Sequence, residues 1–279
     1  MAITVDEFLH ETEGVRPLVR KLLDDGLVLV ENPHEPWQKP HHSFFMGRTT
    51  VSQALWTALM GNNPSVYRKD DPVEAERYPV DDVSIKDCLD FISRLNNRKE
   101  VKAKGLLFRL PKGAEWRFAC RAGGEPYQSG KLACANEGIR LEEVAWYKGN
   151  FTQFPVNDRD LNSMPRKIAR SAPQIRKVDP DGVALRKINH AEIRGPRPMG
   201  CLLENEFGLF DMFGNLWEWT LERGATQGEL WGGSWADDPE ACDWRPRKAF
   251  PKRGDGVTGL RLVAVRKAGR KKSSDIPKS

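Results

Sequence analysis

The segment from Phe207 to Trp219 reads Phe-Gly-Leu-Phe-Asp-Met-Phe-Gly-Asn-Leu-Trp-Glu-Trp, and it is the most informative stretch of the chain. Its dipeptide Gly214-Asn215 can adopt positive φ at little steric cost, which predicts a turn. Asp211 and Glu218 stand on either side of that turn. A turn here brings the two acids toward freed backbone carbonyls, and calcium prefers such a cluster of oxygens. The alternative is an aromatic core hairpin whose acids are solvated.

Six further motifs accompany this segment. Those upstream are Gly47-Arg-Thr-Thr-Val-Ser-Gln-Ala-Leu-Trp56, Met60-Gly-Asn-Asn-Pro-Ser65, Tyr78-Pro-Val-Asp-Asp-Val-Ser84 and Phe108-Arg-Leu-Pro-Lys-Gly-Ala-Glu-Trp116; those downstream are Trp231-Gly-Gly-Ser-Trp235 and Gly259-Leu-Arg-Leu-Val263. This ordered set resembles the formylglycine-generating enzyme (sulfatase-modifying factor) family over residues 28–266. The family domain is an irregular α+β variant of the C-type lectin fold. The resemblance implies two main helices, near 50–61 and 84–97, packed on short antiparallel sheets.

Local patterns predict where these helices begin. Thr50 or Ser52 is suited to cap a helix that runs to Met60, and the Ser84 hydroxyl is suited to cap a second. Apolar residues at helical spacing predict another helix within 5–24, followed by a strand at 27–30. A short helix is expected over 114–121, after the Arg-Leu-Pro turn.

We expect three parts: an N-terminal helical extension over 1–27, one domain over 28–266, and a basic disordered tail over 267–279. No run of 18 apolar residues is present, so no transmembrane helix is expected. The first residues lack the pattern of a secretory signal. The cysteines are odd in number and lack a metal-type CxxC pair, which favours a reduced, cytoplasmic setting. They are Cys88, Cys120, Cys134, Cys201 and Cys242.

The formal net charge of +5 comes from the C-terminal end of the chain. From Arg266 onward, basic residues outnumber the single acid, Asp275, by five, so the rest of the chain is formally neutral. Such a body has no overall basic face for nucleic acid. Nucleic acid is therefore not an expected partner, except through the basic tail or the arginine-rich insertion at 157–195. The simpler interpretation of both segments is solvated chain.

The family resemblance implies two calcium sites. The first would use the Asp211 side chain, the carbonyls of Gly214 and Leu216, and the Glu218 carboxylate. The second would use Asn150, Phe151, Asp181 and Val183, although inserted residues after Val183 leave that alignment open. Calcium would have a structural role, because a hard cation can hold loops that lack regular hydrogen-bonded ladders.

The enzymes of the family oxidise a substrate cysteine with molecular oxygen, using copper held by two cysteines that are five positions apart. In this chain Cys242 matches the second cysteine, but Asp237 stands at the first position. A carboxylate is a hard ligand and a poor substitute for thiolate on Cu(I), so copper is not expected. Cys201 or Cys134 remains as a partner that could approach in space.

Iron-dependent chemistry, which is also known on this domain type, needs a His-x-x-x-His-x-Glu arrangement. The histidines are His10, His34, His41, His42 and His190, and none fits that pattern. Non-haem iron is therefore not expected.

Two functions remain from the sequence. The first is a binding or effector module for a protein or small-molecule ligand. Its surface would lie at 235–256 and consist of Trp235, Asp237, Asp238, Asp243, Trp244, Arg245, Arg247 and Lys252. The second is an oxygen-dependent oxidoreductase with a rearranged site around Ser234, Asp237 and Cys242. Because the copper pair is incomplete, binding is favoured over catalysis.

Overall fold

A computed structural model describes residues 5–31, 42–122, 141–150, 195–247 and 256–267, with side chains from residue 14 onward. Several predictions fall outside these ranges and stay predictions. They concern Phe151, Asp181, Val183, Lys252, Cys134, nearly all of the 157–195 insertion and the tail beyond Lys267.

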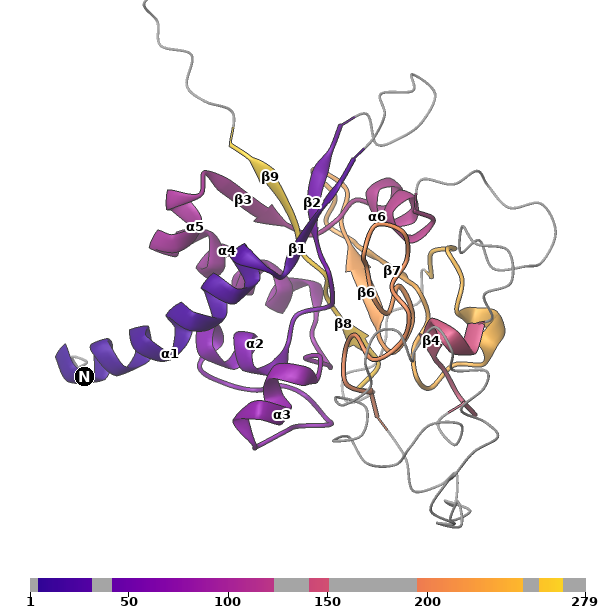
Figure 1. Cartoon of the computed structure of the whole chain (residues 1–279), viewed down its shortest axis with the longest axis horizontal. Helices are drawn as coiled ribbons and strands as arrows, with labels where there is room; N and C mark the ends of the chain where they lie inside the picture. Colours follow the sequence, from indigo (N-terminus) through magenta and orange to yellow (C-terminus); the bar gives the residue numbers. More distant parts are fainter. Residues whose placement is uncertain (1–4, 32–41, 123–140, 151–194, 248–255, 268–279) are drawn as a thin grey trace, which may run out of the picture.

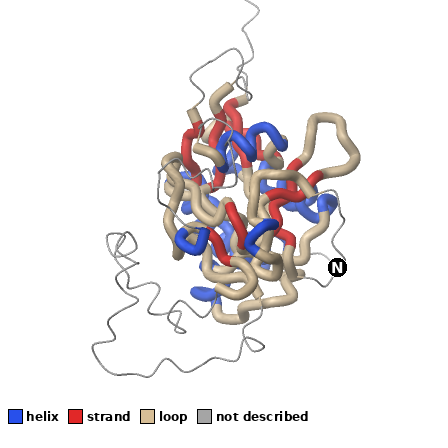
Figure 2. The backbone as a smooth tube through the Cα atoms, turned by 90° about the vertical axis from the view of Figure 1, so that its right-hand side faces the viewer, coloured by secondary structure: helices blue, strands red, loops and turns tan. Residues whose placement is uncertain are grey.

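Figure 1 shows helices α1 to α5 grouped on one side of the chain and the β6–β7–β8 sheet on the other, with strands β1, β2 and β9 between them. Figure 2 shows that loops and turns make up much of the described chain.

The described helices are mostly short. They are α1 (Val5–Asp24), α2 (Gln53–Met60), α3 (Pro72–Arg77), α4 (Ile85–Asn97), α5 (Lys99–Ala103) and α6 (Gly113–Cys120), with 3-10 turns at Leu141–Glu143 and Pro239–Ala241. The expected helices at 50–61, 84–97 and 114–121 correspond to α2, α4 and α6.

Local capping explains the two main helices. The Ser52 hydroxyl accepts a hydrogen bond from the Leu55 backbone at the start of α2, and Gly61 ends that helix with φ 79°. At the start of α4, Ser84 and Asp87 form a capping box. The helices meet where Trp56 stacks on Phe91 with ring centroids 5.0 Å apart.

The strands form three small sheets. Sheet one has the order β1 (Leu27–Val30), β2 (Phe44–Gly47), β9 (Val263–Arg266), β3 (Leu106–Arg109), and all its pairs are antiparallel. Sheet two has the order β7 (Glu229–Trp231), β6 (Trp217–Thr220), β8 (Thr258–Gly259), and sheet three pairs β4 (Ala145–Trp146) with β5 (Phe213–Gly214) in parallel. The last strand, β9, thus lies between two strands from the first half of the chain. The fold is α+β, as predicted, although the small sheets include parallel pairs as well as antiparallel ones.

Both main hydrophobic clusters combine early and late parts of the chain. The larger joins α1, α2 and α4 to Trp217, Trp219 and Leu262. The second joins Phe44 and Met46 of β2 to α6, Phe213 and Val263. Each cluster therefore draws on both the early and the late parts of the described chain, and α1 packs in the larger cluster through Val15 and Val19.

Candidate functional site

The turn at 214–215 is built as the dipeptide predicts. Gly214 and Asn215 have φ of 68° and 59°, the left-handed region that glycine and asparagine tolerate best. A Cβ on Gly214 would lie 2.1 Å from the carbonyl oxygen of Trp146. The Asn215 amide donates to that same carbonyl at 2.7 Å. Only glycine fits between the turn and β4.

Asn215 also ties the turn to a distant segment with its side chain. Its Oδ1 accepts a hydrogen bond from the Arg197 amide at 2.8 Å, and its Nδ2 donates to the Arg197 carbonyl at 3.2 Å. These two hydrogen bonds resemble those that a pair of residues forms between neighbouring β-strands. The turn is therefore held by backbone on two sides.

Glu218 and Arg261 form a buried ion pair, with side chains 1% and 0% exposed. The distance from Arg261 Nη2 to Glu218 Oε1 is 2.7 Å, and Nε lies 2.9 Å from Oε2. Trp116 donates its indole N–H to the same Oε2 at 2.7 Å. Arg261 further donates to the carbonyls of Gly47, Arg48 and Phe210. The pair thus joins strands and loops from the start, middle and end of the chain.

Asp211 is buried and only half satisfied. Its Oδ2 accepts a hydrogen bond from the Gly200 amide at 2.8 Å, whereas its Oδ1 has no hydrogen-bond partner. Burial raises the pKa of Asp211 to about 6; the Gly200 bond and Arg261 oppose this rise, and Glu218 adds to it. An ionised carboxylate with an unpartnered buried oxygen is unfavourable unless a cation approaches it.

The predicted calcium ligands fit unevenly. Asp211 fits, because its Oδ1 is free of other bonds. Glu218 is already engaged by Arg261 and Trp116, so it would have to share its oxygens with a cation. Among the described residues, no three His, Cys, Asp or Glu side chains form a metal-binding group. The predicted first calcium site has only two acids, Asp211 and Glu218, and takes its other ligands from the carbonyls of Gly214 and Leu216. The absence of a group of three therefore does not test this site, which stays a prediction.

The one described member of the second calcium set is Asn150, which is 1% exposed. Its Oδ1 accepts from the Tyr147 amide at 3.0 Å and its Nδ2 donates to the Ala145 carbonyl at 2.6 Å. These bonds hold the turn that follows β4. The ligand role of Asn150 also stays a prediction.

Asp237, at the position of the missing copper cysteine, is an internal hydrogen-bond acceptor. Its Oδ2 accepts the Trp217 indole N–H at 2.7 Å and also the Ser234 hydroxyl. Its Oδ1 lies 3.2 Å from Nη1 of Arg247, whose guanidinium stands over the Trp217 ring. The Asp237 carbonyl accepts from the Lys148 amide at 2.9 Å. The carboxylate therefore organises its own loop.

Cys242 is 3% exposed and packs in the second hydrophobic cluster. Burial raises the pKa of its thiol to about 12, and the nearby acids Asp237, Asp243 and Glu240 add to that rise. Cu(I) binds the thiolate, so a thiol held protonated is a poor ligand. Cys201 belongs to a different cluster, with Trp146 and Trp235. The described cysteines are all free thiols.

The described residues of the predicted ligand surface are half-buried or exposed, and several of them form ion pairs. Arg245 pairs with Asp243, and Lys148 pairs with Asp238, each at 3.2 Å. Trp244 is half-buried against the second cluster. Trp235 is half-buried too: its indole N–H donates to the Gly256 carbonyl at 2.8 Å, and its ring meets Tyr67 edge-on. The described side chains thus present acids, arginines and aromatic edges together.

Sequence reasoning gave no role to three important buried residues. Arg261 was visible as a lone charge inside the apolar run Leu260-Arg-Leu-Val-Ala264. Glu115 is fully buried and accepts two hydrogen bonds of 2.6 Å from Arg109, within the motif that ends at Trp116. Asp81 is also fully buried and accepts from the amides of Val66 and Tyr67. A charged residue in an apolar run was the available signal in the case of Arg261.

The α+β fold and the ordered motifs are those of a lectin-like scaffold of the sulfatase-modifying type. Residues 20–266 match the family described as "Sulfatase-modifying factor enzyme 1-like domain". The chain therefore belongs to this family. This confirms the family that the sequence motifs indicated.

Individual proteins that resemble the chain are distant. "Chaperone protein LppX" of Paenibacillus barcinonensis is 25% identical over 86% of this chain and 90% of its own length. The solved structure "Treponema denticola variable protein 1" has a TM-score of 0.49 and 22% identity, covering 86% of this chain and 91% of that one. PvdO from Pseudomonas aeruginosa has a TM-score of 0.48 and 15% identity, covering 85% and 90%.

Proposed function

We propose that this chain is a binding member of the sulfatase-modifying factor family that does not carry out copper-dependent cysteine oxidation. The observation that carries the proposal is the position of Asp237 and the hydrogen bonds that its carboxylate accepts. A hard carboxylate stands where the family chemistry needs a soft thiolate, and its oxygens already accept from Trp217, Ser234 and Arg247. Copper therefore does not fit the residues present.

The alternative is an oxidoreductase with a rearranged site around Ser234, Asp237 and Cys242. Ser234 is fully buried and donates its hydroxyl to Asp237, so it is not exposed to a substrate. The Cys242 thiol is buried with a pKa raised to about 12, so it is protonated at neutral pH. Both observations favour binding over catalysis.

We place the ligand surface of this binding role at 235–256. In its described part, Arg245 and Arg247 are exposed beside acids, and the loop beneath is fixed by the Asp237 bonds. Because each arginine already has an acidic neighbour, the surface suits a polar protein or small-molecule ligand of mixed charge rather than a polyanion. A role in binding is also in keeping with a relative that is named as a chaperone protein.

Calcium is the cofactor that we propose, with a structural role at Asp211. Its support is the buried Oδ1 that lacks a partner, together with the pKa raised to about 6. A bound cation would favour the ionised form and remove the unfavourable burial of that oxygen.

Among the described helices, none has the length and apolar character of a membrane span. We propose a cytoplasmic location, in keeping with the free thiols of the described cysteines.

The experiment measures Cu(I) affinity by competition with a chromophoric chelator, together with turnover of a Cys-x-Pro-x-Arg peptide. We expect weak Cu(I) binding that Cys242→Ala leaves unchanged, and no conversion of the peptide thiol to aldehyde. Asp237→Cys should raise Cu(I) affinity by orders of magnitude if the loop keeps its shape. Tight Cu(I) binding that is lost in Cys242→Ala, or aldehyde formation by the unmodified protein, would overturn the proposal.

A further inference from the structure

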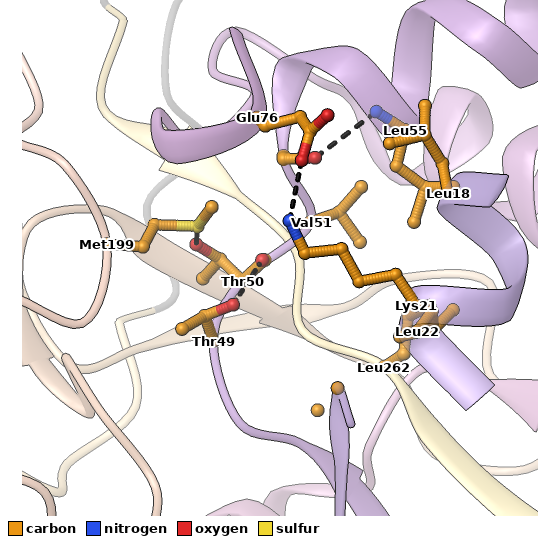
Figure 3. Close-up of a pocket in the computed structure, with 13 residues that line it drawn as sticks. Leu18, Lys21, Leu22, Thr49, Thr50, Val51, Leu55, Glu76, Met199 and Leu262 are labelled. Carbon is orange, nitrogen blue, oxygen red and sulfur yellow. Dashed lines mark hydrogen bonds and ion pairs between the residues drawn. The ribbon is translucent and has the colours of Figure 1, made fainter. Parts of the chain in front are cut away.

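A cavity of about 130 Å³ lies at the seam between α1 and the rest of the domain (Figure 3). Its lining comes from α1, from the segment that leads into α2, and from single residues of distant segments, among them Glu76, Met199 and Leu262. None of the predicted calcium, copper or ligand-surface residues lines it. It is therefore a separate candidate site.

The walls of the cavity are mainly apolar. Leu18 and Leu22 of α1 are four residues apart and so lie on one face of that helix. They line the cavity together with Leu55 of α2 and with Leu262. An apolar cavity of roughly 150 Å³ is known to hold benzene, so this space suits a body of about six to eight non-hydrogen atoms.

One polar group in the lining is poorly satisfied. Thr50 is 6% exposed, and its hydroxyl donates to the thioether sulfur of Met199 at 3.1 Å. A thioether is a weak acceptor compared with an oxygen. Figure 3 shows both side chains at the same side of the cavity. A ligand oxygen that replaced the sulfur would therefore improve this hydrogen bond.

An exposed ion pair in the lining stands at the mouth of the cavity. Lys21 Nζ lies 2.6 Å from Glu76 Oε2, and the two side chains are 67% and 39% exposed. A surface pair of this kind contributes about 0–1 kcal/mol, so it is not a barrier to entry. Because its two charges neutralise each other, the mouth favours neither an anion nor a cation. The ligand that fits is uncharged.

We propose that this cavity binds a small uncharged molecule that has an apolar ring or branched body and one acceptor oxygen, of the phenol class. The apolar body contacts Leu18, Leu55 and Leu262, and the oxygen accepts a hydrogen bond from Thr50. Because the cavity is walled by α1 on one side and by the domain on the other, the bound molecule also stabilises the docking of α1.

The test uses the full chain and three probes of similar size: phenol, benzene and benzoate. Binding is measured by calorimetry and by the shift of the melting temperature. We expect saturable binding of phenol with one site, about fivefold weaker binding of benzene for lack of the hydrogen bond, and no saturable binding of benzoate.

Two variants and a control assign the site. Thr50→Val keeps the shape and should remove the preference for phenol over benzene, whereas Thr57→Val, at an exposed position of α2, should keep it. Leu18→Phe fills the space and should abolish binding of both. No saturable binding by the unmodified chain, preference for benzoate, or unchanged selectivity in a folded Thr50→Val protein would each overturn the proposal.

Discussion

Arg261 and Glu218 face each other inside the protein with 2.7 Å between Nη2 and Oε1, and neither side chain is more than 1% exposed. Each has other partners: Trp116 donates to Glu218, and Arg261 donates to the carbonyls of Gly47, Arg48 and Phe210. The pair is therefore a cross-link among segments that have few hydrogen-bonded ladders of their own.

Arg261→Met should lower the free energy of unfolding by about 3–5 kcal/mol, because it leaves Glu218 buried without its counter-charge. Arg261→Lys should also be strongly destabilising, because an ammonium group lacks the planar fork that reaches both Glu218 and the carbonyls. Urea unfolding measures the change. Arg245→Met, at an exposed position, is the control and should change stability by less than about 0.5 kcal/mol. A small effect of Arg261→Met would mean that the pair contributes little.

Asp211→Asn should remove part of the pH dependence of stability when calcium is chelated. Because burial raises the pKa of Asp211 from 3.8 to about 6, the folded state binds the proton more tightly than the unfolded state. The stability from this group is full below about pH 4 and is lost as the pH rises through about 6. As the pH rises through that window, the free energy of unfolding of the variant should therefore increase relative to that of the wild type, by on the order of 2–3 kcal/mol.

The measurement for Asp211 is urea unfolding at several pH values in chelator. The pKa of Asp81 is also raised to about 6 by burial, so Asp81→Asn should show the same direction independently. A difference between Asp211→Asn and wild type that stays constant from pH 4 to 7 would contradict the raised pKa.

Removal of calcium should lower the melting temperature of the wild-type protein, and Asp211→Asn should abolish the difference between chelator and added calcium. Glu218→Ala should abolish it too, but it also lowers the melting temperature itself because it breaks the Arg261 pair. Asp238→Asn changes an exposed acid and should keep the calcium response. Identical wild-type melting curves in chelator and in calcium would mean that no structural calcium binds.

Gly214→Ala should destabilise the protein far more than Gly61→Ala. Both glycines have positive φ, 68° and 79°, so each substitution carries the backbone strain of about 1–2 kcal/mol. Only at Gly214 would the new Cβ meet backbone, 2.1 Å from the Trp146 carbonyl, whereas nothing lies within 4 Å at Gly61. Thermal unfolding of the two variants compares them directly. Equal losses would mean that β4 can move away from the turn.

Features that depend on neighbouring residues could be predicted from the sequence. The caps at Ser52 and Ser84 and the turn at Gly214-Asn215 are examples, since each rests on a few adjacent side chains. The motif order also indicated the family. Sheet order could not be predicted, because β2 pairs with β9 across more than two hundred residues and both strands are short.

The candidate site was predictable only in its residue types. The sequence placed Asp211 and Glu218 beside one turn. It did not indicate that Arg261 donates both to Glu218 and to three backbone carbonyls. Likewise, Asp237 was recognisable as standing where the family has a cysteine, whereas its bond to the Trp217 indole depends on packing. Both outcomes are set by contacts between distant segments, which spacing along the chain does not contain.

The place of β9 has a consequence for how the chain folds during its synthesis on the ribosome. Strands β2 and β3 pair with β9 and not with each other, so both keep an open edge until residues 263–266 emerge from the exit tunnel. Open strand edges invite pairing with other nascent chains. The four-stranded sheet therefore closes only after nearly the whole domain has been translated.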